Sequence, residues 1–117
     1  MNKSDFFPTR PELNPTIYAY ELPGVPDHKG LLKIGFTTRA AQNRVAEQTR
    51  TSGIQTKIVF EESAMRSDGS DFTDHEIHRY LRRKGVKNKN GEWFECSVAE
   101  VKAAVIAVKN GVENEEN

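Results

Sequence analysis

Residues 17–36 read IYAYELPGVPDHKGLLKIGF, and this stretch decides the fold. Ile17–Leu22 is rich in β-branched and aromatic residues and stops at a Pro-Gly pair, which predicts a strand. Leu31–Phe36 predicts a second strand, because the proline- and glycine-containing segment 23–30 between them has loop chemistry. We expect these two strands to pair antiparallel as a hairpin. Gly35, inside the second strand, indicates a close approach by another group or the end of the strand.

The remaining segments predict helices and further extended pieces. In chain order they are a helix from Thr37 or Thr38 to about Arg50, a strand at Gln55–Glu61, a helix at Asp71–Gly85, a short extended piece at Glu92–Cys96 and a helix capped by Ser97. The order β-β-α-β-α-(β)-α predicts an α+β fold, with a small antiparallel three-stranded β-sheet flanked by helices. We expect an irregular lead-in at residues 1–15, one domain at 16–110 and a disordered tail or linker at 111–117.

Composition and charge restrict the class of protein. A chain of 117 residues is expected to form one domain, and its zero formal net charge argues against nucleic-acid binding by bulk positive charge. The single cysteine, Cys96, excludes an intrachain disulfide and fits a reducing cytoplasm. No apolar run approaches the roughly 20 residues needed to cross a membrane, and the N-terminus lacks the apolar core of a secretory signal. We therefore expect a soluble cytoplasmic protein.

The basic residues are concentrated in two places. Between Ile77 and Gly91 the chain carries no acidic residue and these basic ones: Arg79, Arg82, Arg83, Lys84, Lys87 and Lys89. Arg39, Arg44 and Arg50 form a second, sparser group. Such runs occur on nucleic-acid-binding surfaces and equally on solvated helix faces, so the charge pattern leaves both interpretations open.

Three side chains have the chemistry that phosphodiester hydrolysis requires. Tyr18 supplies a hydroxyl that can orient water or take its proton, and Arg44 supplies a cation for developing negative charge. Glu76 supplies a carboxylate for a divalent ion. Such a set is common in domains of this size, so it is the order and spacing of these residues that gives it weight.

That order and spacing resemble a known nuclease family. The residues that match the motifs of the GIY-YIG endonucleases are Ile17-Tyr18, Lys33-Ile34-Gly35, Arg44 and Glu76. The match is closest to a phage and bacterial branch with KIG as the second motif, whose later elements resemble Glu76-Ile-His78 and Glu92-Trp93-Phe94. The resemblance covers residues 16–96. It departs from the family at Thr16, where the first motif has glycine, and at Lys33, where the second has tyrosine.

The resemblance implies a metal-dependent DNA endonuclease. Tyr18 would act as general base or orient the attacking water, Arg44 would bind the scissile phosphate, and Glu76 would ligate one Mg²⁺ or Mn²⁺ ion. Lys33 would hydrogen-bond phosphate or lower the pKa of Tyr18, and His78 would contact phosphate or support the site. The residues that would bind the DNA backbone are Arg39, Arg50, Arg79, Arg82 and Arg83.

Structural interpretations of the same residues remain open. Tyr18 suits the interior of an ordinary strand, and Arg44 is spaced to pair with Glu47 or Gln48 on one helix. Thr73-Asp-His-Glu76 is a capping-box pattern, in which the glutamate closes the start of a helix.

Alternatives for the function remain open as well. Zero net charge predicts weak, salt-sensitive DNA binding, so we expect one module of a longer restriction, repair or mobile-element protein. A catalytically inactive nucleic-acid-binding module on the same fold is one alternative, and a protein-interaction domain is another. A zinc site at His75 and His78 is not expected, because further ligands at suitable spacing are lacking.

Overall fold

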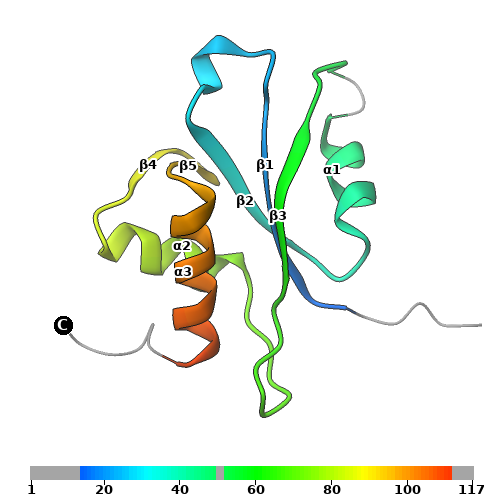
Figure 1. Cartoon of the computed structure of the whole chain (residues 1–117). Coiled ribbons are helices and arrows are strands. Elements are labelled where there is room, and N and C mark those ends of the chain that lie inside the picture. Colours follow the sequence, from blue (N-terminus) through cyan, green and yellow to red (C-terminus); the bar gives the residue numbers. More distant parts are fainter. Residues whose placement is uncertain (1–13, 50–51, 112–117) are drawn as a thin grey trace, which may run out of the picture.

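Five antiparallel strands form one sheet in the order β3-β1-β2-β5-β4 (Figure 1). The computed structural model describes residues 14–49 and 52–111. The strands are β1 (Thr16–Glu21), β2 (Leu31–Thr37), β3 (Lys57–Ser63), β4 (Lys87–Asn90) and β5 (Trp93–Glu95). The helices are α1 (Ala41–Thr49), α2 (Asp74–Arg83) and α3 (Val98–Lys109), and a short 3-10 turn, η2, covers Pro26–His28. α1 lies on one side of the sheet, with α2 and α3 on the other (Figure 1).

The α+β class and the β1–β2 hairpin are confirmed, but the expected sheet of three strands is wrong. The additional strands are β4 and β5, which join through a turn at Gly91, where φ is +52°. β4 reads KNKN and has little strand propensity of its own. Its hairpin is held by the Asn88 amide, which donates to the carbonyls of Gly91 and Trp93, each at 2.9 Å. Residues 87–90 therefore form a strand because they pair with β5, and not because of their own propensity.

The two earlier helices begin later than the sequence predicted. Thr37 Oγ1 accepts the backbone N–H of Arg39 at 3.0 Å in a local turn, and α1 starts only at Ala41. Its expected end at Arg50 lies outside the described residues. α2 starts after Thr73, which caps it, rather than at Asp71. The capping box predicted at Ser97 is confirmed at the start of α3.

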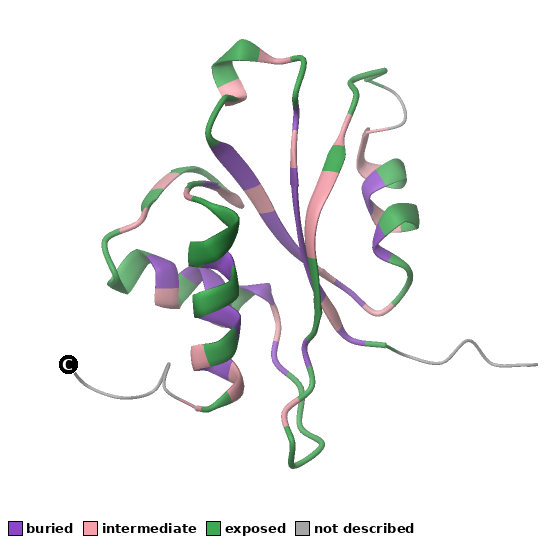
Figure 2. Cartoon of the chain, viewed as in Figure 1, coloured by how far each residue is buried: buried purple, intermediate pink, exposed green. Residues whose placement is uncertain are grey.

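Alternation along β1 and β2 divides the apolar residues between two cores. On β1, Ile17 and Ala19 belong to the cluster under α2 and α3, whereas Tyr18 and Tyr20 belong to the cluster under α1. This is the period of two that a strand imposes on its side chains. A sheet covered on both faces explains why every one of these residues is buried (Figure 2).

The larger core lies between the sheet and the helices α2 and α3. The stripe of α3 that was predicted to face inward is buried, and it comprises Val101, Ala104, Val105 and Val108. It meets Ile77 and Leu81 of α2 in one apolar cluster. Within residues 14–49 and 52–111, no helix has both the length and the apolar character needed to cross a membrane.

Candidate active site

Tyr18 stands at the centre of a polar cluster on the α1 side of the sheet. It faces Gly35 across the β1–β2 ladder, and its ring is buried to 1% exposure. A Cβ built on Gly35 would overlap the phenol oxygen and ring of Tyr18. The close approach predicted at Gly35 is therefore confirmed, and the group that approaches is the Tyr18 hydroxyl.

α1 directs two polar side chains at the tyrosines of β1. Gln48 and Arg44 lie one helical turn apart, and both interact with the Tyr18 hydroxyl. The Tyr20 hydroxyl also donates to Gln48 Oε1, at 3.4 Å. Arg44 stays accessible, because its side chain is 42% exposed, and one of its amino groups lies 3.7 Å from Glu47. The helix thus places a solvent-accessible cation beside a buried phenol.

Lys33 and Glu92 complete the cluster from the β2 and β5 side. Lys33 Nζ lies 3.8 Å from Glu92 Oε1 and 5.8 Å from the centre of the Tyr20 ring. The lysine side chain is 20% exposed and the glutamate side chain 40%. Trp93, next in the chain, packs edge-on against Tyr20 with 5.7 Å between ring centres. Two cations, one carboxylate and two phenols are therefore gathered on one face of the sheet.

Burial raises the pKa of both phenols further above neutral pH. Burial is the main cause that raises the pKa of Tyr18, and the hydrogen bond from Gln48 and the charge of Arg44 offset part of that rise. Burial, with the neighbouring Tyr18 and Glu92, raises the pKa of Tyr20 to about 12. Both hydroxyls are therefore protonated at neutral pH. The Tyr20 hydroxyl already donates to Gln48, so Tyr18 is the donor that can orient a water molecule or a phosphate oxygen.

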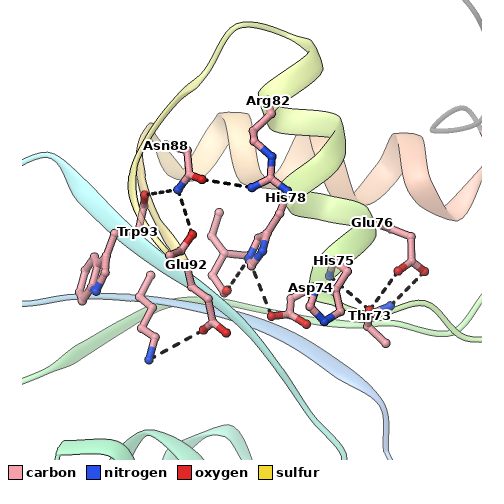
Figure 3. A network of polar contacts seen from close by, with 12 residues as sticks. Thr73, Asp74, His75, Glu76, His78, Arg82, Asn88, Glu92 and Trp93 are labelled. Carbon is pink, nitrogen blue, oxygen red and sulfur yellow. Dashed lines mark hydrogen bonds and ion pairs between the residues drawn. The ribbon is translucent and has the colours of Figure 1, made fainter.

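Glu76 lies at the start of α2, on the opposite side of the sheet from α1. Its Oε2 accepts the backbone N–H of Thr73 at 3.3 Å, and its Oε1 lies 3.0 Å from Thr73 Oγ1. These contacts form the capping box that the sequence pattern also allowed. Figure 3 shows the Glu76 carboxylate directed at Thr73, whereas the Glu92 carboxylate points away from α2. The carboxylate that acts on the tyrosines is that of Glu92.

His78 anchors α2 to the backbone of β2. Its Nε2 donates to the carbonyl of Ile34 at 2.8 Å, and Asp74 Oδ2 lies 3.8 Å from the same nitrogen (Figure 3). The N–H of Ile34 in turn donates to the carbonyl of Glu92 at 3.0 Å. Both polar groups of Ile34 are thereby held, one residue before Gly35. His78 lies with α2 on the side of the sheet away from the two phenols, so it positions the site rather than contacting a substrate there.

The arginines expected to bind DNA have different environments. Arg39 forms a bidentate pair with Glu47 at 2.9 and 2.7 Å, which occupies its guanidinium. Arg79, Arg82 and Arg83 are exposed on α2, where Arg82 also donates to Asn88 at 3.1 Å. Arg50 lies outside the described residues.

A divalent ion bound to this chain would have to be held by a single carboxylate. Among residues 14–49 and 52–111, no group of three or more His, Cys, Asp and Glu side chains is placed to hold a metal. Mg²⁺ is often held by one or two carboxylates together with the phosphates of its substrate. An ion held by this chain would therefore need further oxygen ligands from its substrate.

Hydroxyl donors and two cations on an α+β scaffold define a domain suited to phosphate binding. A family model, T5orf172 domain, matches residues 16–109, and the chain belongs to that family. The T5orf172 domain is a nuclease-like, DNA-binding domain associated with endonuclease-like proteins. No curated protein matches the chain, and no solved structure does.

The assignment to the GIY-YIG family is wrong, because the family model that matches describes a different family and no GIY-YIG match is found. The short motifs behind that assignment, Lys33-Ile34-Gly35 and Glu92-Trp93-Phe94, have structural duties that favour the same residue types. Gly35 leaves room for Tyr18, and Trp93 and Phe94 lie on opposite faces of the sheet, each in a core.

Three members of the cluster were not picked as site residues from the sequence. The spacing does indicate Tyr20, because it lies two residues after Tyr18 and so points to the same face of the strand. Gln48 lies one helical turn after Arg44, which places both on one side of α1. No spacing in the sequence indicates Glu92 as a member of the cluster, because its place beside Lys33 depends on β5 pairing with β2.

Replacing Gly35 with alanine should lower the free energy of unfolding by about 1–3 kcal/mol, as overpacking of a buried site does. The new methyl group overlaps the buried Tyr18 ring, which has no free space to move into. Urea denaturation measures the change. Gly24→Ala is the matched control, because a Cβ there meets nothing within 4 Å, and its effect should stay within about 0.5 kcal/mol. Equal effects of the two substitutions would contradict the contact.

The raised pKa of Tyr20 contributes to the free energy of unfolding, and this contribution falls at alkaline pH. The folded state favours the protonated phenol, so this contribution is complete below pH 10 and is lost as the pH rises toward about 12. Tyr20→Phe should remove about 2–3 kcal/mol of that alkaline loss. Denaturation of wild type and variant across this range measures it, and parallel alkaline losses in the two proteins would refute it.

Proposed function

We propose that this chain is an endonuclease domain that hydrolyses DNA phosphodiester bonds with the help of one Mg²⁺ or Mn²⁺ ion. The observation that carries the proposal is that two cations meet the buried tyrosines of β1, with Arg44 beside the Tyr18 hydroxyl and Lys33 over the Tyr20 ring. Membership of a family associated with endonuclease-like proteins supports the same conclusion.

The cluster matches the charge that develops during phosphodiester hydrolysis. The planar guanidinium of Arg44 suits two phosphate oxygens at once, and Lys33 adds a point charge on the neighbouring strand. Tyr18 donates a hydrogen bond to the attacking water or to a phosphate oxygen. Groups that are already in place need no reorganisation as charge develops, and removing one such donor typically costs about 100- to 1000-fold in rate.

The ion is proposed to be held by Glu76 together with a DNA phosphate at the start of α2, on the side of the sheet opposite α1. When bound, it would polarise the phosphate and promote formation of hydroxide from water. Glu76 must then turn away from Thr73, which gives up part of a capping interaction worth about 1 kcal/mol.

The exposed basic residues of α2 and β4 are proposed to bind the DNA backbone. Arg79, Lys87 and Lys89 are exposed, and they extend from the helix to the edge strand of the sheet. Zero formal net charge limits the affinity of this surface. We propose that further domains of a longer parent protein, acting in the cytoplasm, supply the targeting, and that residues 16–110 form the catalytic module.

The capping box favours a second candidate function. Glu76 already has a structural partner in Thr73, so the same fold can serve as a DNA-binding module without catalysis. A protein-interaction domain would use the basic α2 surface against an acidic partner, and DNA would then fail to compete for it.

Plasmid nicking at low salt with Mg²⁺ or Mn²⁺ tests the function. Wild type should convert supercoiled DNA to the open circle, and Arg44→Ala should reduce the rate by about 100-fold or more. Glu76→Gln should abolish cleavage as well, because the amide preserves the capping box but removes the charge that binds the ion.

Glu100→Gln is the matched control. Glu100 closes the capping box of α3 as Glu76 closes that of α2, so the two substitutions perturb their helices equally. Cleavage by Glu76→Gln at the rate of Glu100→Gln would remove Glu76 from the site. A folded wild type that binds DNA and does not cut it would leave the DNA-binding module as the function.

A further inference from the structure

Glu92 is the carboxylate of the cluster, and its backbone holds it firmly in place. Its carbonyl accepts the N–H of Ile34 at 3.0 Å, immediately before β5 joins β2. Its side chain reaches toward Lys33, with 3.8 Å between the charged atoms. With 40% of the side chain exposed, the carboxylate is accessible to water.

Hydrolysis of a phosphodiester needs a group that accepts the proton of the attacking water. The phenols of Tyr18 and Tyr20 are poor acceptors, because burial keeps both protonated at neutral pH. Lys33 and Arg44 are cations and have no lone pair to offer. Glu92 is the carboxylate that acts on both phenols, whereas Glu47, the carboxylate beside Arg44, also forms a bidentate pair with Arg39.

On the basis of the proposed function, we propose that Glu92 is the general base of this domain. One O–H bond of the attacking water breaks and its proton passes to a Glu92 carboxylate oxygen, while the water oxygen forms a bond to phosphorus. The P–O bond to one sugar then breaks, and the departing sugar oxygen takes a proton from solvent. Tyr18 donates the hydrogen bond that aims the water, and Arg44 and Lys33 balance the charge on the phosphate.

Charged and titratable groups face Glu92 from three elements. Lys33 approaches from β2, Tyr18 and Tyr20 lie on β1, and Arg44 acts on the same phenols from α1. The 3.8 Å contact with Lys33 gives Glu92 a competing role, which is to hold the lysine in place. The two roles differ in what they change, since a base acts on kcat and a support for a phosphate-binding lysine acts on KM.

The test measures DNA cleavage by the whole chain at saturating DNA, comparing wild type, Glu92→Gln and Glu92→Ala. Glu92→Gln should lower kcat by about 100- to 10,000-fold and leave KM within about twofold. Added formate should restore part of the rate of Glu92→Ala, because a small carboxylate can enter the space and accept the proton. Glu95→Gln, an exposed carboxylate on β5 just after Glu92, should cut DNA at the wild-type rate.

Any of the following outcomes would contradict the assignment of Glu92 as the general base. Full activity of Glu92→Gln would show that another group takes the proton. A rise in KM alone, reproduced by Lys33→Gln, would make Glu92 a positioning residue for the lysine. A wild type that binds DNA without cutting it would overturn the proposed function and this role together, whereas an active wild type with an active Glu92→Gln would overturn this role only.

Discussion

The packing of the Tyr18 ring over Gly35 is the constraint on which the site depends. A glycine at this position of β2 lets the phenol lie flat against the ladder, where any side chain would overlap it. The rings of Tyr18 and Tyr20, stacked with 6.3 Å between their centres, then form a surface on which α1 packs through Ala41 and Val45. Because those residues face inward, the side chains of Arg44 and Gln48 reach the phenol hydroxyls.

The two faces of the sheet are coupled through one residue of β2. His78, in the core under α2, binds the carbonyl of Ile34, and Ile34 donates its N–H to Glu92. The large apolar core therefore fixes the backbone from which the Glu92 side chain extends. Rigid placement of this kind matters for catalysis, because groups already in position need not reorganise as charge develops.

Local chemistry predicted much of the fold, and tertiary pairing decided the rest. The strands β1 and β2, the close approach at Gly35 and the cap at Ser97 follow from residue types and spacing alone. β4 could not be predicted, because its residues favour no strand and acquire one only beside β5. At Glu76 the sequence pattern was ambiguous, since one glutamate can close a helix cap or ligate a metal ion. Glu92 joins the cluster by strand pairing, which short motifs do not reveal.

The central claim is that the face of the sheet under α1 binds the scissile phosphate, and NMR with a short DNA duplex tests it most directly. Titration into the labelled protein should perturb the side-chain N–H signal of Arg44 and the indole signal of Trp93 together, with saturation at one common concentration. Perturbations confined to the basic residues of α2 and β4, with the Arg44 signal unchanged, would show that DNA binds without reaching the cluster and would contradict the account.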